Sequence, residues 1–279
     1  MAERPATAML QAPGPRERAI PGNLQSAVRD LQRRKARGRR RLALIEGIRL
    51  VEEALGAGLP FRGALISPEL DRTTRGASLR ADLARRAVPI EGIPARTFAT
   101  LAATDTPQGV LAIVEPRDWT LADIPVGRGR ALLVLDGVQD PGNVGTLIRT
   151  AHALGAGGTV ALRGTADVLN PKALRAAMGA TFRHPVVSLD DAAFISWART
   201  AGVTLWATAA DGEPLPRGVV ETELAGPVAV IVGNEGAGIR PALNAVAAKR
   251  VAIPLAAGAE SLNVAVAAGI LLYEVLRGR

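Results

Sequence analysis

The sequence contains no cysteine, only two histidines among its 279 residues, and few aromatic side chains, which make up 3% of the chain. Without thiols there is no disulfide framework and no thiolate metal centre, and two histidines are too few for a metal cluster, so we expect no metal. The absence of cysteine also suits a reducing compartment and favours a cytoplasmic location. The core must then be aliphatic, and a 48% hydrophobic content is sufficient for one.

Motifs for several common activities are missing as well. The chain has no G-x-G-x-x-G after a strand, no G-x-x-x-x-G-K-[ST] and no G-x-S-x-G, so dinucleotide-binding, P-loop and serine-hydrolase interpretations lack support. The longest apolar run, residues 262–276, is interrupted by polar side chains and is too short to cross a bilayer, so no membrane partner is expected. Residues 1–22 lack the apolar segment of a secretory signal and predict a flexible tail.

Positive charge is concentrated in one short segment. The formal net charge is +8, and residues 29–41 (RDLQRRKARGRRR) hold eight basic residues and one acidic residue, which is +7. A cluster of this density attracts a polyphosphate such as RNA, because binding releases condensed counterions. A solvated helix face or a disordered arm would also explain it. The side chains that we expect to contact RNA are Arg33, Arg34, Lys35, Arg37, Arg39, Arg40 and Arg41.

The pattern of apolar segments predicts an α/β protein with two domains. Residues 23–115 form a small α/β unit, with a basic helix predicted over 24–37 and another over 45–55. Residues 116–129 are rich in proline, glycine and charge, and predict a linker. In residues 130–279, helices alternate with apolar strands, predicted at 131–135, 158–162, 203–207, 228–232 and 251–253.

Such alternation is typical of a mostly parallel sheet that is covered on both faces. Ligands of these sheets bind at the carboxyl ends of the strands. The loops that follow Leu135, Ala207, Val232 and Ile253 are therefore where we expect the functional site.

The first informative loop, residues 140–151 (DPGNVGTLIRTA), leads into a predicted helix. Asn143 can cap this helix through its side chain, and Gly145 permits a close backbone approach. Arg149 follows six residues after Asn143, and the two can reach one ligand if Asn143 lies at the cap. An ordinary capped helix with a surface arginine would contain the same residues.

Two further loops have the same character. Residues 232–239 (VGNEGAGI) pass from a strand into a glycine-rich turn that holds Glu235, which indicates a sharp bend or room for a flat ligand. In residues 253–265 (IPLAAGAESLNVA), Ser261 is the expected cap of the last helix. Asn263 lies in the first turn among apolar residues, where its amide needs a partner. Plain strand–helix turns remain an alternative for both loops.

In this order the three loops resemble the three motifs of the SpoU (TrmH) class in the SPOUT superfamily of RNA methyltransferases. The pattern N-x-G-x-x-x-R-x-A is met by Asn143, Gly145, Arg149 and Ala151. The pattern G-x-E-x-x-G is met by Gly233, Glu235 and Gly238. The pattern I-P followed by S-L-N-V is met by Ile253, Pro254, Ser261, Leu262, Asn263 and Val264.

The resemblance implies a fold, a cofactor and a site. The fold would be a trefoil-knot methyltransferase domain with a mostly parallel sheet, preceded by a small α/β substrate-binding domain, and the protein would work as a homodimer. S-adenosylmethionine would donate the methyl group without a metal, in a pocket lined by Gly233, Ile253, Leu262 and Thr208. The implied catalytic residues are Arg149, Asn143, Glu235, Ser261 and Asn263.

The implied reaction is attack of a ribose 2′-oxygen on the sulfonium methyl group. The residues leave open whether Arg149 or Glu235 takes the proton, although a guanidinium normally stays protonated and suits the stabilisation of alkoxide charge better. The two-domain organisation looks like that of relatives that act on 23S ribosomal RNA, some of which protect antibiotic producers. A tRNA substrate and a non-catalytic RNA-binding module on the same scaffold are the alternatives.

Overall fold

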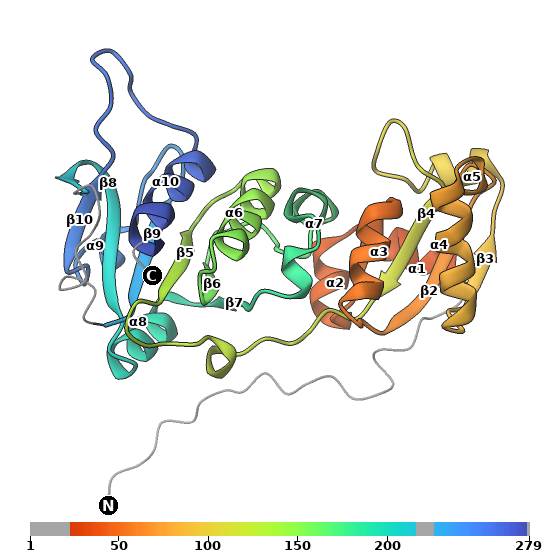
Figure 1. Cartoon of the computed structure of the whole chain (residues 1–279), viewed down its shortest axis with the longest axis horizontal. Coiled ribbons are helices and arrows are strands. Elements are labelled where there is room, and N and C mark those ends of the chain that lie inside the picture. Colours follow the sequence, from red (N-terminus) through yellow and green to blue (C-terminus); the bar gives the residue numbers. More distant parts are fainter. Residues whose placement is uncertain (1–22, 216–225, 278–279) are drawn as a thin grey trace, which may run out of the picture.

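The computed structural model describes residues 23–215 and 226–277, which contain two separate β-sheets (Figure 1). The predicted flexible tail, residues 1–22, lies outside the described residues. Residues 115–130 connect the two sheets without contributing a strand to either, and contain one short 3₁₀ turn, Leu121–Asp123. No helix of the described part of the chain is long and apolar enough to span a membrane.

The N-terminal sheet has four strands in the order β1-β4-β2-β3. Its strands are β1 (Ala43–Glu46), β2 (Phe61–Ile66), β3 (Ile90–Gly92) and β4 (Val110–Val114). Strand β4 is antiparallel to both β1 and β2, whereas β2 and β3 are parallel. Successive side chains of a strand point to opposite faces of the sheet, so alternate residues of these strands are buried in two separate hydrophobic clusters, one on each face. One face is covered by α1 (Leu24–Leu31) and α5 (Ala95–Ala99), the other by α3 (Ile48–Gly56) and α4 (Thr74–Arg85).

Two helices predicted in this unit differ from those observed. The basic helix expected over 24–37 is broken at Arg33, whose backbone is extended (φ −88°, ψ 131°), and a second helix, α2, covers Arg34–Arg40. The helix expected from residue 45 begins only at Ile48. Residues 43–46 instead pair with β4, so pairing in the sheet overrides a helical spacing of apolar residues. Gly47 makes the turn with a φ of +97°, which favours glycine.

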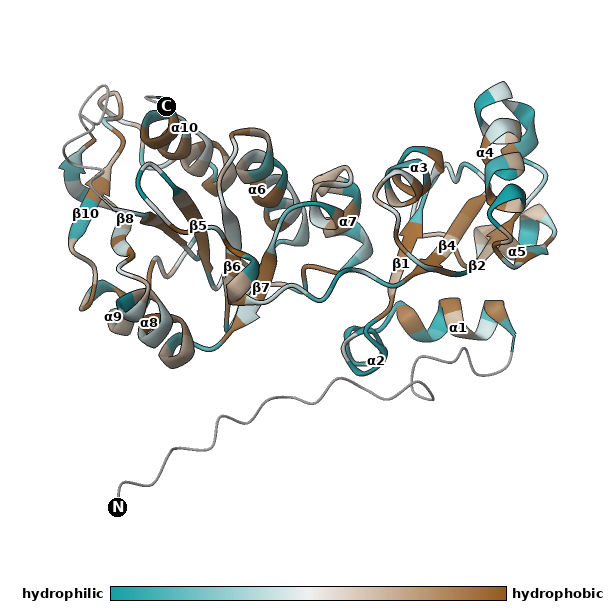
Figure 2. Ribbon diagram, turned by 60° about the horizontal axis from the view of Figure 1, so that its bottom comes forward, coloured by the Kyte–Doolittle hydropathy of each residue, from teal (hydrophilic) through white to brown (hydrophobic). Residues whose placement is uncertain are grey.

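The C-terminal sheet has six strands in the order β10-β8-β9-β5-β6-β7, and all neighbouring pairs are parallel. Its strands are β5 (Ala131–Asp136), β6 (Gly158–Leu162), β7 (Val186–Leu189), β8 (Thr204–Pro214), β9 (Val228–Gly233) and β10 (Lys249–Ala252). The prediction of a mostly parallel sheet is thus confirmed. In Figure 2 the central strands β5 and β4 are largely hydrophobic, as expected for strands covered on both faces, whereas the edge strand β10 is partly hydrophilic.

Helices cover both faces of this sheet. One face of β5 and β9 packs against α6 (Pro141–Ala153) and α10 (Val264–Leu276), and the opposite face against α8 (Asp191–Thr200) and α9 (Pro241–Asn244). The chain leaves β5 toward β6 and β7, then returns to β8 and inserts β9 between β8 and β5. The winding therefore reverses between β5 and β9, and the carboxyl ends of such neighbouring strands form a ligand-binding crevice. The threading of a trefoil knot stays a prediction.

The two sheets are joined by side chains as well as by the linker. Helix α7 (Pro171–Ala177) and the turn after it place Leu174 and Phe182 in the core of the N-terminal unit. Arg183 binds Glu53 at 2.7 Å across the same boundary.

The prediction that Arg37 contacts RNA does not fit its position. Its side chain is 2% exposed, and its guanidinium forms an ion pair with Asp167 at 2.6 Å. Its Nη1 also donates hydrogen bonds to the carbonyl oxygens of Leu31 and Gln32. A buried guanidinium needs these partners, and Asp167 lies 130 residues away in the chain, so sequence spacing could not reveal the pair. Arg37 connects the basic segment to the C-terminal unit instead.

Candidate active site

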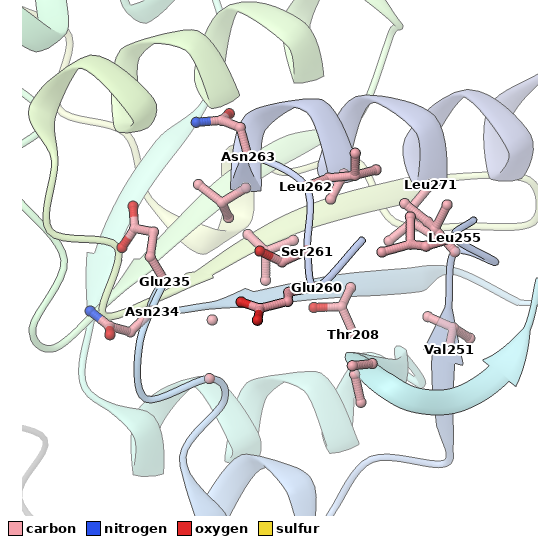
Figure 3. A pocket seen from close by; sticks show the side chains of 18 residues that line it. Thr208, Asn234, Glu235, Val251, Leu255, Glu260, Ser261, Leu262, Asn263 and Leu271 are labelled. Atoms are coloured by element: carbon pink, nitrogen blue, oxygen red, sulfur yellow. The ribbon is translucent and has the colours of Figure 1, made fainter. Parts of the chain in front are cut away.

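A cavity of about 450 Å³ opens at the carboxyl ends of β9 and β10 and beside the middle of β8, beneath the start of α10 (Figure 3). This volume lies within the range of small-molecule sites. All four residues predicted to bind a cofactor line the cavity: Gly233, Ile253, Leu262 and Thr208. Three of the residues predicted to be catalytic line it as well: Glu235, Ser261 and Asn263.

Strand β8 forms one wall of the cavity through an irregularity in its pairing. The strand pairs with β9 up to Ala207, and its register against β10 then jumps from Ala207 to Glu213. Residues 208–212 are left out of the ladder on that side. Thr208, Ala209 and Ala210 of this bulge face the cavity, so a break in the sheet creates part of the binding surface.

The glycine-rich turn after β9 is held in place by Asn234, a residue that belongs to none of the three motif patterns. Its Oδ1 accepts hydrogen bonds from the backbone N–H groups of Gly236 and Ala237 at 3.0 and 2.9 Å. Its Nδ2 donates to the carbonyl oxygen of Gly137 at 3.0 Å, which ties the turn to the loop after β5. The signal in the sequence was asparagine two residues before a glycine, a common start of such a turn.

A buried carboxylate fixes the other end of this turn. Asp136, 1% exposed at the end of β5, accepts hydrogen bonds from the backbone N–H of Arg240 at 2.7 Å and from its Nε at 2.5 Å. Burial alone would lower the pKa of Arg240, but the carboxylates of Asp136 and Asp191 outweigh it and hold the pKa above its usual value. The loops after β5 and β9 are therefore locked together.

A directed chain of hydrogen bonds starts at α10 and ends at Glu235. Asn263 Oδ1 accepts the backbone N–H groups of Ala265 and Val266, so its Nδ2 must point outward. That Nδ2 donates to Asn143 Oδ1 at 3.1 Å, and Asn143 Nδ2 then donates to Glu235 Oε1 at 2.9 Å. Since each amide has one acceptor and one donor end, the anchored end at α10 sets the orientation of the whole chain.

The structure corrects both predicted helix caps. Asp140, not Asn143, caps α6, because Asp140 Oδ1 accepts the backbone N–H of Asn143 at 2.9 Å. A hydrogen bond from Lys172 and this backbone contact hold the pKa of Asp140 below its usual value. Asn263, not Ser261, caps α10. Asn143 thus lies in the first turn, where its side chain is free to bridge Asn263 and Glu235.

Arg149 does not line the cavity. It follows Asn143 by six helical residues, which places it roughly 9 Å further along α6. Its side chain is exposed beside α10 and, among the described residues, has no hydrogen-bond or ion-pair partner. Of the predicted catalytic residues, Asn263, Asn143 and Glu235 are joined by hydrogen bonds, Ser261 lines the same cavity, and Arg149 lies apart.

The described residues contain no group of three or more histidine, cysteine, aspartate or glutamate side chains that could hold a metal ion. A parallel sheet whose strand-end loops enclose a cavity and bring the three motifs together is the architecture of the SPOUT methyltransferases. Within that class, residues 130–273 match the SpoU rRNA Methylase family, and the chain belongs to this family. Residues 26–112 match the MRM3-like substrate binding domain.

Similar sequences and solved structures agree with this family membership. The chain is 38% identical over 248 residues to the 23S rRNA (guanosine(2553)-2′-O)-methyltransferase RlmP of Bacillus subtilis, covering 89% of this chain and 93% of the relative. It is 31% identical to a 23S rRNA (uridine(2479)-2′-O)-methyltransferase of Streptomyces viridochromogenes, covering 85% and 83%. The crystal structure of an AdoMet-bound rRNA methyltransferase from Sinorhizobium meliloti superposes with a TM-score of 0.79 at 33% identity, covering 93% and 96%.

The turn after β9 gives a testable consequence for stability. A Cβ at Gly233 would lie 2.3 Å from the backbone carbon of Gly238, whereas a Cβ at Gly236 would meet nothing closer than 3.7 Å. Gly233→Ala must therefore displace backbone, and we expect it to lower the free energy of unfolding by about 2–3 kcal/mol. Gly236→Ala should change it by less than about 0.5 kcal/mol. Urea unfolding of both variants measures the difference, and equal stabilities would contradict the close approach.

Proposed function

We propose that the protein transfers a methyl group from S-adenosylmethionine to a ribose 2′-hydroxyl of ribosomal RNA, with 23S rRNA as the favoured substrate. The observation that carries this proposal is the hydrogen-bond chain from Asn263 through Asn143 to Glu235 at the edge of the cavity. It unites one residue from each of the three motifs. The named 23S rRNA methyltransferases among the relatives support the substrate, and tRNA is the second candidate.

The cavity suits the cofactor in its chemistry. Aliphatic side chains and glycine backbone dominate its lining, so flat apolar and hydrogen-bonding parts of a nucleoside can both be accommodated. Gly233, Ile253, Leu262 and Thr208 would hold the cofactor. When bound, it supplies a methyl group already activated by a positive sulfur.

The residues beside the cavity would prepare the hydroxyl group. A ribose hydroxyl is a weak nucleophile at neutral pH, so it must be oriented and its proton accepted. Glu235 offers a carboxylate whose position is fixed by Asn143 and, through Asn143, by the cap of α10. Arg149 would stabilise the negative charge that develops on the 2′-oxygen, because a guanidinium remains protonated.

We further propose that Arg149 acts on the site of a second copy in a homodimer. The face formed by α6 and α10 exposes large apolar side chains, with Val266 50% exposed, Ile270 40% and Tyr273 52%. Arg149 lies on that face beside Ile270 and Tyr273. Exposed apolar residues gathered around a charged residue are typical of subunit contacts, and a two-fold contact exchanges equivalent residues between the copies.

Replacing Arg149 tests its role. Arg149→Ala should bind S-adenosylmethionine normally but transfer methyl groups about 10²- to 10³-fold more slowly, because charge stabilisation is lost only in the transition state. The control is Arg199→Ala, which removes an exposed arginine from α8. Tritium transfer into rRNA and calorimetric cofactor titration provide the two measurements. Near-normal turnover would refute the assignment.

Mixing two inactive variants tests whether Arg149 of one subunit acts on the site of the other subunit. Ala267→Phe fills the cavity and leaves Arg149 intact, since Ala267 lines the cavity from α10. If Arg149 serves the partner, an equimolar mixture of the two variants regains about a quarter of all sites, because about half of the dimers are mixed and one site in each mixed dimer is complete. If it serves its own chain, activity stays absent.

The dimer itself should depend on the α6–α10 face. We expect Ile270→Asp to raise the dissociation constant of the dimer at least about tenfold, because the substitution places a charge in an apolar contact. Val246→Asp, at a hydrophobic residue of similar exposure (37%) outside this face, should leave the mass unchanged. Sedimentation equilibrium distinguishes the outcomes, and a monomeric parent protein would overturn the dimer proposal.

The basic segment would bind the RNA backbone. Arg33, Arg34, Lys35 and Arg39 are exposed on or beside α2, whereas Arg37 is buried. Arg39 and Arg40 form ion pairs with Asp30, and Arg41 forms one with Asp118, so these three are partly engaged. A ribosomal RNA substrate also favours a cytoplasmic location, which we propose with it. The link to antibiotic resistance stays a prediction.

Removing the exposed charges should weaken RNA binding in a salt-dependent way. The triple replacement of Arg33, Arg34 and Arg39 by alanine should lower the slope of log affinity against log salt by about 0.7 to 0.9 for each phosphate that is no longer neutralised. The matched control replaces Arg72, Arg80 and Arg85, which lie on or near α4 over the opposite face of the N-terminal sheet. Filter binding at several salt concentrations gives both slopes. Identical slopes would exclude the basic segment as the RNA-binding surface.

A further inference from the structure

The loop that closes the cavity contains a second carboxylate, Glu260, which belongs to none of the three motif patterns. Glu260 lines the cavity together with Ser261 and Thr208. In the view of Figure 3 its carboxylate lies between Asn234 and Thr208, and the residue is exposed at the mouth of the cavity. It has no hydrogen-bond or ion-pair partner among the residues that the structure describes.

The charge of the cavity is one-sided. Among the described residues that line it, Glu235 and Glu260 have the only charged side chains, and none is cationic. Glu235 already accepts a hydrogen bond from Asn143 at the edge of the site. Glu260 is thus the carboxylate that remains available to a bound molecule.

A carboxylate in this position favours a cationic ligand over a neutral ligand of the same shape. The methyl donor of the proposed function and its demethylated product differ by one methyl group and by the positive charge on sulfur. Loss of the methyl group turns the sulfonium into a neutral thioether. Over a few ångströms in a partly closed site, attraction between unit charges is large enough to affect affinity.

We infer that Glu260 is a specificity residue that makes the cavity prefer the charged sulfonium donor to its neutral thioether product. The inference rests on the proposed function. As a consequence, transfer of the methyl group lowers the affinity of the cavity for the bound molecule, so the thioether product dissociates more readily. The backbone groups of Gly233 and Ile253, which also line the cavity, carry no net charge and so offer no comparable attraction to a positive sulfur.

The experiment compares three ligands by calorimetry on the full-length protein: S-adenosylmethionine, S-adenosylhomocysteine, and the analogue in which an amine-bearing carbon replaces the sulfonium. Glu260→Gln keeps the shape of the side chain and removes its charge. We expect about a three- to tenfold loss of affinity for the two cationic ligands and less than about a twofold change for the thioether. Asp105→Asn is the control, since it removes an exposed carboxylate from the N-terminal unit with no described partner.

The outcomes separate the two proposals. An equal loss for all three ligands, or no loss for any, overturns the role of Glu260 while leaving the proposed function intact. If the unaltered protein binds none of the three, the proposed function fails and this inference fails with it. Inhibition by the thioether during turnover gives an independent measure, because it should strengthen relative to donor binding in Glu260→Gln alone.

Discussion

The polar side of the site depends on one helix terminus. The first N–H groups of α10 have no partners within the helix, and Asn263 supplies one through its side-chain oxygen. Because that oxygen is occupied, the rest of the amide has one possible direction, and so has Asn143 next to it. Glu235 receives the last donor of the series. A structural cap therefore also determines the orientation of the Glu235 carboxylate at the edge of the cavity.

The apolar side of the site lies beside the point where the sheet reverses its winding. Strands β5 and β9 lie side by side, yet their following segments run to opposite sides, and the cavity opens next to this junction, against β8, β9 and β10. Hydrogen bonds join the loops that follow β5 and β9 at this junction: one links Arg240 to Asp136 and another links Asn234 to Gly137. The cavity is consequently built on fixed backbone, as binding sites that must hold a precise geometry require.

Much of this arrangement could be predicted from the sequence because the signals were local. The strand Gly158–Leu162 is a short, mostly apolar segment between turn residues, and it was predicted with the observed bounds. The choice of caps could not be predicted, since Asp140 and Asn143, like Ser261 and Asn263, are neighbouring residues with similar capping ability. The burial of Arg37 depends on Asp167, which tertiary folding alone brings near. The position of Arg149 outside the cavity could not be predicted for a related reason, because it is set by how α6 packs against α10.

The buried pair of Arg37 and Asp167 has a consequence for substrate selection. Helix α2 is anchored through it to the unit that contains the cavity, which sets the separation between the basic surface and the cavity. An RNA held by both must present a backbone and a reactive sugar at that same spacing. The distance between the two surfaces would then select the substrate, and the folded shape of the RNA, more than its base sequence, would decide which nucleotide reaches the cavity.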